Sequence, residues 1–258
     1  MPQRKLVRIF PEPAANLSVN EVYADLNLPA GRSARPYTLI NAIGTLDGRG
    51  AVGGKSTPIG SEVDHRLMRN IRSNVDAVLV GAGTLRSEDL TLNVDESLAK
   101  RRRDHGLQEQ PLPIILTRSG NIPAGRKIFR TSGKSDLLIL AGSQADQQQL
   151  ATLSEMATVR MVTVNNTLGP EEILETLAEE FGIRSLLLEG GPSVNHSFLK
   201  ARLVDELFLT LAPKIVGVGP NSLVEGELPP QDVTAPSLVS VYLYDSEVFL
   251  RYRLRHKP

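Results

Sequence analysis

Two segments that lie far apart in the chain have the residue types of one nucleotide site. The first is Thr38–Gly48 (TLINAIGTLDG), followed closely by Val78–Thr84 (VLVGAGT), and the second is Leu186–Asn195 (LLLEGGPSVN). In each segment, an apolar run typical of a buried strand ends in small residues at a turn. Strands that open into glycine-rich loops are where α/β proteins bind phosphorylated ligands. The pattern therefore predicts a single site for a phosphorylated ligand, assembled from both segments.

The turn that begins at Glu189 carries the stronger of the two signals. The apolar run Arg184–Leu188 ends in an acid, two glycines and a proline, and proline is favoured as the first residue of a helix. The amides of Gly191, Ser193 and Val194 would lie at the positive end of that helix, where they suit a pyrophosphate. Glu189 would face a ligand at the strand end, unless it only caps the turn or forms a local salt bridge.

The turn Gly81-Ala82-Gly83-Thr84 follows the apolar run Asp76–Val80. Its glycines would let backbone amides approach a phosphate and Thr84 would add a hydroxyl donor, although a tight turn that binds nothing also fits. It is neither the GxGxxG fingerprint nor a Walker A loop. Asp47, in the turn Leu46-Asp47-Gly48, would bind substrate or stabilise that turn.

The composition excludes several classes of protein. The 258 residues are 41% hydrophobic and 22% charged, as in ordinary globular proteins, and their net charge is zero. A neutral chain is not expected to bind nucleic acid by neutralising phosphates over a broad surface. No apolar run approaches the roughly 20 residues that cross a bilayer, and residues 1–10 lack the features of a secretory signal. We therefore expect no membrane association and a cytoplasmic location.

Residue types also limit the chemistry. The chain has no cysteine, which excludes disulfides, thiolate nucleophiles and Cys-ligated metals. Its four histidines, including His65 and His196, show no metal-site spacing, so no metal is expected. Ser56 and Ser193 lack the G-x-S-x-G context of a serine hydrolase. A nucleotide-dependent reductase that uses NAD(P)H is the leading hypothesis.

Apolar periodicity predicts one α/β domain at residues 36–258, preceded by a Pro-rich arm at residues 1–35. In the arm we expect a short helix near Val19–Leu26, with Ser18 as N-cap and Glu21 completing a capping box. Further helices are expected at Ser61–Arg72, Asp146–Ala157, Pro170–Phe181 and Pro192–Ala201. Strands are expected at Tyr37–Ile43, Asp76–Val80, Pro111–Leu116, Asp136–Ala141, Val159–Val164 and Arg184–Leu188. The alternation after Asp136 predicts parallel βαβ units.

The C-terminal part of the chain has a different pattern of predicted elements. Glu206–Ala212, Leu238–Leu243 and Val248–Leu254 are predicted strands with no helix between them, and Tyr244–Glu247 suggests a hairpin turn. The expected fold class is therefore α/β, with a mostly parallel central sheet flanked by helices and an antiparallel C-terminal hairpin. The polar segment Ser87–Gln110 is expected to form a long surface loop or lid.

The order of these motifs resembles the pyrimidine reductases of riboflavin biosynthesis, including the reductase half of the bacterial bifunctional deaminase/reductase. The segments that carry the resemblance are Tyr37–Gly48, Lys55–Arg72, Asp76–Glu88, Leu186–Asn195 and Val204–Gly219. The resemblance implies a dihydrofolate-reductase-like fold and a homodimer. It also implies hydride transfer from NADPH to C1′ of a ring-opened ribosylamino-pyrimidine 5′-phosphate, which gives the ribityl derivative. The zinc deaminase signatures are absent.

The same resemblance assigns roles to individual residues. The cofactor-binding residues that it implies are Gly44, Gly81, Gly83, Thr84, Glu88, Gly190, Gly191, Pro192, Ser193, Val194 and Asn195. Ser56, Arg72 and Glu189 are expected to bind substrate, and Arg72 could pair with its phosphate. Asn41, Asp47 and Glu189 are the expected catalytic residues, which orient or polarise the substrate. No side chain is an obvious proton donor, which leaves water for that role. Arg86 and Arg118 are candidates for contact with the 2′-phosphate of NADPH.

Three positions depart from the family pattern and leave the substrate open. Asn41 stands where many bacterial members have lysine, Pro58 where they often have an aromatic residue, and Asp95 where many have a phosphate-binding arginine. A 2-amino and a 2-oxo pyrimidine both stay possible substrates. The alternatives are a reductase of the same fold that acts on another heterocycle, such as a dihydropterin, and an NADPH-binding protein without catalysis.

Overall fold

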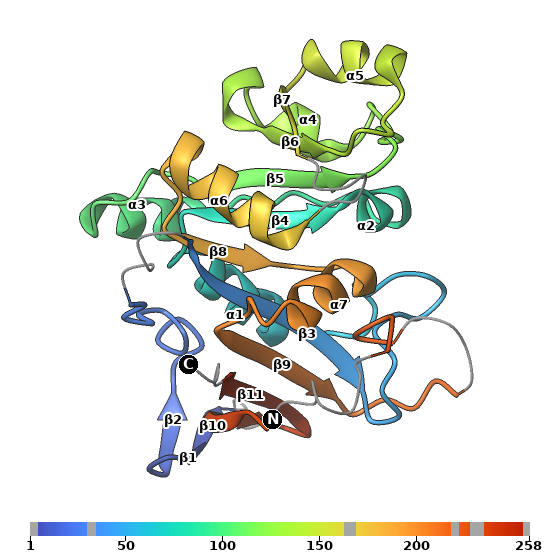
Figure 1. The fold of residues 1–258 in the computed structure, drawn as a ribbon. Coiled ribbons are helices and arrows are strands. Elements are labelled where there is room, and N and C mark those ends of the chain that lie inside the picture. The colour runs from blue at the N-terminus through green and yellow to red at the C-terminus, as the bar shows by residue number, and fades with distance from the viewer. Residues whose placement is uncertain (1–4, 30–34, 163–168, 218–221, 228–234, 255–258) are drawn as a thin grey trace.

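A single mixed sheet of 11 strands forms the centre of the computed structural model (Figure 1). The structure describes residues 5–29, 35–162, 169–217, 222–227 and 235–254. The strand order is β2-β1-β10-β11-β9-β3-β8-β4-β5-β6-β7. All pairs from β9 to β7 in this order are parallel, and the pairs on the β2 side of β9 are antiparallel. This is the predicted fold class, a mostly parallel sheet with an antiparallel edge.

The strands and helices have these bounds. The strands are β1 (Leu6–Phe10), β2 (Ala14–Leu17), β3 (Tyr37–Thr45), β4 (Ala77–Gly81), β5 (Leu112–Thr117), β6 (Leu138–Ala141), β7 (Thr158–Met161), β8 (Ser185–Leu188), β9 (Glu206–Ala212), β10 (Ser237–Tyr244) and β11 (Glu247–Arg253). The helices are α1 (Glu62–Arg72), α2 (Ala82–Ser87), α3 (Glu96–Asp104), α4 (Lys127–Thr131), α5 (Gln147–Ser154), α6 (Pro170–Phe181) and α7 (Pro192–Lys200), with a short 3-10 helix at Lys134–Asp136.

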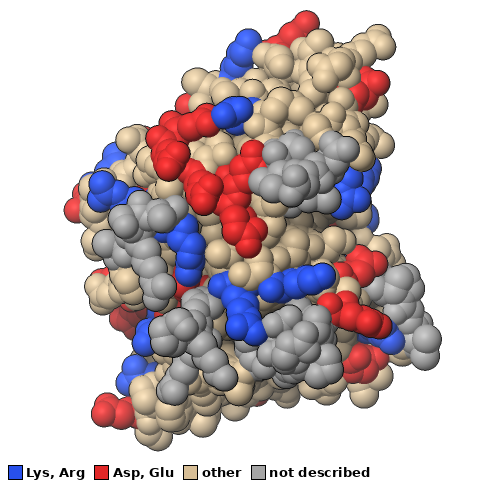
Figure 2. Space-filling view, viewed as in Figure 1, with Lys and Arg blue, Asp and Glu red and all other residues tan. Residues whose placement is uncertain are grey.

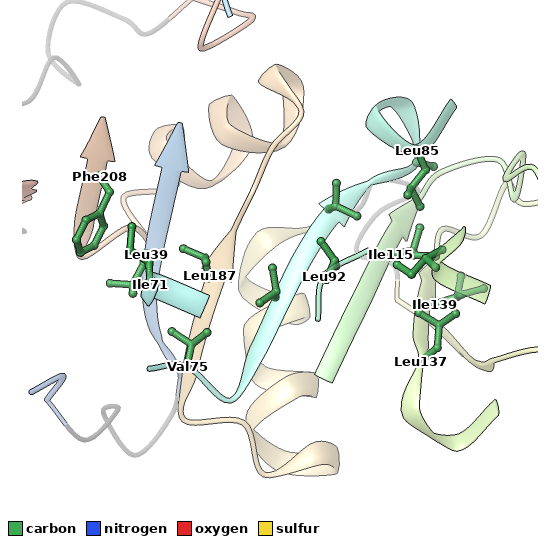
Figure 3. Packing of buried hydrophobic residues seen from close by; sticks show 14 of the residues in the cluster. Leu39, Ile71, Val75, Leu85, Leu92, Ile115, Leu137, Ile139, Leu187 and Phe208 are labelled. Carbon is green, nitrogen blue, oxygen red and sulfur yellow. The ribbon is translucent and has the colours of Figure 1, made fainter. Parts of the chain in front are cut away.

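The central strands are apolar without alternation because helices cover both faces of the sheet. Alternate residues of β4 and β8 belong to two different cores. Val78 and Leu187 pack in the core that contains α1 and α5, whereas Leu79 and Leu188 pack against α6 and α7. Figure 3 follows the first core across the sheet, from Phe208 on β9 to neighbouring strands.

Local signals fix where the main helices begin and end. The Ser61 hydroxyl accepts a hydrogen bond from the Asp64 amide (3.1 Å) and caps α1. Pro170 opens α6, and Gly182 ends it in the left-handed conformation at φ 66°. The outer face of α6 carries exposed glutamates (Figure 2), which is the solvated side of an amphipathic helix. Among the helices that the structure describes, α6 is the longest at 12 residues, too short to cross a membrane.

The helix predicted near Val19–Leu26 is wrong, because the structure has turns there. The capping contact does form, since the Ser18 amide donates to the Glu21 carboxylate at 3.2 Å. The chain cannot continue as a helix because Tyr23 has a positive φ of 58°. Tyr23 is instead buried edge-on against Phe208 and Tyr242, so tertiary packing overrides the local signal.

The first strands extend the sheet at its antiparallel edge. β1 pairs with β10 and β2 pairs with β1, although prolines hide both strands in the sequence. The division into an arm at 1–35 and one reductase domain at 36–258 stays a prediction.

The segment Ser87–Gln110 is not a continuous loop, so that prediction is wrong in part. Asp95 caps α3 by accepting a hydrogen bond from the Leu98 amide at 3.1 Å. Leu98 and Arg102 are on the buried face of α3, and the Arg102 guanidinium donates to the carbonyl of Val75 at 2.6 Å. Buried contacts that are distant in sequence therefore order a segment whose composition is polar. The predicted strand Val159–Val164 ends at Met161 as β7, and residues 163–164 lie outside the described residues.

Candidate functional site

A cleft of about 1220 Å³ opens at the carboxyl ends of β3, β8, β4 and β5. It is larger than most pockets for one small molecule, so it has room for a dinucleotide and a substrate together. α1, the start of α2 and the start of α7 line it, together with residues 50–57 and 222–225. Parallel strands bring their loops to one edge of the sheet, which is why segments far apart in sequence meet there.

The two glycine turns predicted from the sequence lie against each other in this cleft. The amide of Gly81 donates to the carbonyl of Gly190 at 2.7 Å. A β-carbon on Gly81 would lie 3.1 Å from Val194 Cγ2, and one on Gly191 would lie 3.2 Å from the Thr84 hydroxyl. Glycine thus permits the close approach of two backbones, and the predicted segments form one site.

The start of α7 has free amides in the cleft. Gly191 is the N-cap and no side chain caps the helix. The amides of Val194 and Asn195 donate to the Gly191 carbonyl, at 2.9 and 3.1 Å. Gly191 and Ser193 therefore keep amides without a hydrogen bond to the described residues, and these two can receive a phosphate. The Val194 amide, which the sequence assigned to a pyrophosphate, is already engaged.

The side chain of Asn195 has a further acceptor at this helix start. Its amide nitrogen donates to the carbonyl of Leu223 at 3.2 Å, while its buried Oδ1 has no partner among the described residues. A buried acceptor without a partner is destabilising unless a donor reaches it. A ligand hydroxyl in the cleft would be such a donor, so this end of the site fits a nucleotide.

Glu189 and Arg72 form a buried ion pair in the wall of the cleft. Two parallel hydrogen bonds of 2.6 Å join the Arg72 Nε and Nη2 to the carboxylate of Glu189. The Arg72 side chain is 6% exposed and that of Glu189 is 9% exposed. The third nitrogen of Arg72 donates to the carbonyl of Thr91 at 3.1 Å. The pair joins residues 117 positions apart, so it is not the local salt bridge that the sequence left open for Glu189. Because its donors are engaged, Arg72 is less available to a substrate phosphate than the sequence suggests.

Glu88 and Ser56 lie together, although the resemblance assigns one to the cofactor and the other to the substrate. The Ser56 amide and hydroxyl donate to Glu88 Oε1 at 2.6 and 2.7 Å, and the Thr57 hydroxyl donates to Oε2 at 2.5 Å. Burial raises the pKa of Glu88, but the hydrogen bonds from Thr57 and Ser56 outweigh it and hold the pKa below its ordinary value. Glu88 therefore fastens the segment that carries Ser56 to the wall of the cleft.

Two predicted site residues lie outside the lining of the cleft. The Asp47 carboxylate is exposed and accepts hydrogen bonds from the Thr45 hydroxyl (2.5 Å) and from the amides of Val216 (3.1 Å) and Gly217 (2.7 Å). These bonds, that of Thr45 first, lower its pKa to about 2. Gly44 faces Leu223, and a β-carbon added at Gly44 would lie 3.2 Å from a methyl group of that leucine. Asp47 thus joins two loops beside the cleft, and its catalytic role stays a prediction.

Asp64 is a cleft residue that the sequence reasoning missed. It lines the cleft near Asn41, and it is only 8% exposed. Burial is the largest cause that raises its pKa to about 7; a hydrogen bond with Thr210 opposes the shift, and Glu247 and Glu189 add to it. The sequence does contain a signal for Asp64, because its spacing places it on the same face of the helix as the buried Leu67 and Ile71. An acid on the inner stripe of an amphipathic helix is unusual.

Together these features define an α/β protein with a nucleotide-sized cleft at the carboxyl edge of its sheet. The RibD C-terminal domain family matches residues 36–250, and the chain belongs to this family. The chain is 31% identical over 194 residues to the 2,5-diamino-6-ribosylamino-4(3H)-pyrimidinone 5′-phosphate reductase of Methanothermobacter thermautotrophicus, covering 75% of this chain and 85% of the relative. It is 30% identical over 200 residues to the reductase of the same name from Aquifex aeolicus, covering 75% and 84%.

Solved structures agree on the fold. A pyrimidine reductase-like protein from Corynebacterium diphtheriae superimposes with a TM-score of 0.73 at 24% identity, over 86% of this chain and 93% of that one. RibD from Acinetobacter baumannii gives a TM-score of 0.70 at 23% identity, over 86% of this chain and 59% of that one. The dihydrofolate-reductase-like fold that the resemblance implied is therefore confirmed.

Proposed function

We propose that this protein is an NADPH-dependent reductase that converts a ribosylamino-pyrimidine 5′-phosphate to its ribitylamino form in riboflavin biosynthesis. The observation that carries the proposal is the contact between the two glycine turns, Gly81 to Gly190, inside the cleft of a RibD-family chain. The named reductases of Methanothermobacter and Aquifex give the substrate class. The same resemblance supports a homodimer, and a cytoplasmic location is proposed from the sequence features given above.

The cofactor would lie across the starts of α2 and α7. Its pyrophosphate would meet the free amides of Gly191 and Ser193, at the positive end of α7. Three cationic side chains, Arg86, Arg118 and Lys127, line the cleft beyond β4 and β5 and are exposed. A cluster of cations supports NADPH over NADH, because only NADPH carries a 2′-phosphate. When bound, the cofactor supplies the hydride, and the protein holds the substrate in place and excludes water.

The substrate would lie between the cofactor and α1. Asn41 and Ser56 line this part of the cleft; Asn41 offers an amide to the substrate, and the Ser56 hydroxyl, which donates to Glu88, can still accept a hydrogen bond from it. Arg69, one turn before Arg72, is half-buried in the lining and forms no ion pair with a described residue. We assign the substrate phosphate to Arg69, with the neutralised pair of Arg72 and Glu189 as the wall beside it.

A reductase of another heterocycle is the second candidate, and one contact favours it. Asp95, at the position where many relatives have a phosphate-binding arginine, forms an ion pair with Arg66. This chain therefore has fewer free cations for a phosphate than the family pattern leads us to expect. A substrate panel that includes a dihydropterin separates the two candidates, since only the first requires the pyrimidine.

The cofactor site is tested by binding, without any substrate. Gly191→Val puts a side chain against the Thr84 hydroxyl, whereas Gly125→Val adds one at an exposed position with open space around it. We expect Gly191→Val to weaken NADPH binding about 10- to 100-fold, because overpacking a site typically costs about 1–3 kcal/mol. Gly125→Val should bind NADPH like the unmodified protein in a fluorescence titration. Equal affinities for all three proteins would refute the proposed cofactor site.

A further inference from the structure

The buried Asp64 carboxylate lies in the wall of the cleft, in space that Gly60 leaves open. Asp64 lies in the first turn of α1, on the same side of the helix as Leu67 and Met68. Its carboxylate extends over Gly60, where a β-carbon would lie 2.3 Å from Asp64 Oδ2. Any residue other than glycine at position 60 would collide with the carboxylate in this position. The chain therefore makes room for an acid that is 8% exposed and still faces the cleft.

The charged groups around Asp64 favour its neutral form. No described lysine, arginine or histidine forms an ion pair with it, and the neighbouring charges are the carboxylates of Glu189 on the β8 side and Glu247 on β11. Glu189 is already paired with Arg72, and Glu247 accepts the hydroxyl and amide of Ser61. From β9, only the hydroxyl of Thr210 reaches it. A buried carboxyl among like charges keeps its proton toward neutral pH.

The other polar side chains nearby cannot supply a proton as readily. Both carboxylate oxygens of Glu189 already accept hydrogen bonds from Arg72. Asn41 has no acidic proton. Tyr23 lines the space beneath Asp64, but burial raises its pKa, so its hydroxyl is a poor acid. His65 follows Asp64 on the same turn of α1 and also lines the cleft, whereas Glu62 on this turn is exposed and outside the lining.

We infer that Asp64 is the general acid of the reduction, an inference that rests on the proposed function. The ring-opened substrate has a C1′=N bond. A hydride forms the new C–H bond at C1′, the π electron pair of C1′=N moves to nitrogen, and this nitrogen takes the proton from the Asp64 carboxyl. One hydride and one proton give the ribitylamine and leave Asp64 as a carboxylate. The carboxylate regains a proton from water through the cleft.

The pH dependence of kcat tests this role. Activity should be retained below the pKa of Asp64 and fall as the pH rises through about 7, because the acid form is the active one. Asp64→Asn should lower kcat about 100- to 10,000-fold, the usual contribution of a positioned general acid, and should remove the alkaline fall. NADPH affinity should stay the same, because the variant does not change the cofactor end of the cleft.

A second variant keeps the acid and moves its pKa. Thr210→Val removes the hydrogen bond that lowers the pKa of Asp64, so the alkaline fall in kcat should move to higher pH. As a readout that needs no turnover, infrared spectra near pH 6 should show a protonated carboxyl band in the unmodified protein that Asp64→Asn lacks. His65→Gln is the comparison variant for the neighbouring titratable group and should keep the band and the alkaline fall.

The outcomes separate the two proposals. If the unmodified protein reduces a pyrimidine but Asp64→Asn keeps its rate and its alkaline fall, the acid role of Asp64 is overturned and the proposed function stands. The same holds if His65→Gln, and not Asp64→Asn, removes the alkaline fall. If the unmodified protein reduces neither pyrimidine, the proposed function and the role of Asp64 fail together, whatever the infrared band shows.

Discussion

Replacing Asp64 by asparagine should stabilise the fold, and increasingly so as the pH rises. Burial is the main reason that the pKa of Asp64 rises from 3.8 to about 7, and two neighbouring carboxylates, those of Glu247 and Glu189, add to the rise. Between these two values the unfolded chain has lost this proton while the folded protein keeps it. Stability therefore falls as the pH rises, and above about pH 7 the folded protein holds a buried charge. Asparagine has nearly the same shape and has no charge to bury.

The size of the effect follows from the two pKa values. A carboxyl group whose pKa rises from 3.8 to about 7 on folding destabilises the native state by about 4 kcal/mol once it is ionised. At pH 5 only part of this penalty is present, about 2 kcal/mol. Asp64→Asn should therefore raise the free energy of unfolding by about 4 kcal/mol at pH 8 and about half of that at pH 5.

Urea unfolding of both proteins at pH 5 and pH 8 measures this difference. Asp25→Asn is the matched control, because Asp25 is exposed and a surface substitution typically changes stability by less than about 0.5 kcal/mol. A gain for Asp64→Asn that is the same at both pH values would refute the reasoning, since a pH-independent gain cannot come from a buried ionisable group. A loss at pH 8 would refute it more strongly.

Three further experiments test the geometry of the cleft. Arg72→Met should lower the free energy of unfolding by about 3–5 kcal/mol, because it leaves the buried carboxylate of Glu189 without a partner. In a double-mutant cycle, adding Glu189→Gln should restore more than half of the lost stability. Additive losses of stability would contradict the ion pair. Glu88→Gln should speed hydrogen exchange at the Ser56 amide and raise KM, and unchanged exchange would remove its role as an anchor. Arg69→Ala should raise KM about tenfold for a phosphorylated substrate but not for its dephosphorylated form, whereas equal effects on both would locate the phosphate elsewhere.

Signals within a few residues of one another predict α1, α5, α6 and α7, whereas the shorter helices α2, α3 and α4 were not predicted. Ser61, Pro170, Gly182 and Pro192 each mark a helix end in the sequence, and each lies at that end in the structure. Caps and prolines act through the backbone groups next to them, so a short stretch of sequence contains the whole cause. The parallel order of the central strands follows from the helices between them.

Features that depend on distant contacts were not predictable in the same way. The turn around Tyr23 has a capping contact that predicts a helix, but the burial of this ring against Phe208 decides its conformation. α3 is held by the buried Arg102, whose partners lie about 30 positions earlier in the chain. Such contacts need the fold before they can be seen.

The candidate site likewise has parts that local sequence predicts and parts that depend on distant contacts. The glycine turns Gly81–Thr84 and Glu189–Asn195 are readable because close backbone approach requires glycine at the turn itself. The pairing of Glu189 with Arg72 joins positions 117 apart and was not predicted, because the sequence suggested only a local partner for Glu189. Asp64 was not singled out in the sequence, because its environment depends on the groups packed around it, among them Thr210 and Glu247 from distant strands.

A deuterium label follows most directly the transfer of the hydride from NADPH to C1′ of the substrate. The protein would be incubated with NADPH deuterated at C4 and, in parallel, with 5-amino-6-ribosylaminouracil 5′-phosphate or its 2,5-diamino-pyrimidinone analogue. We expect a ribitylamino product that carries one deuterium at C1′ from one of the two pyrimidines, which also identifies the substrate. Bound NADPH with no labelled product from either pyrimidine would contradict it.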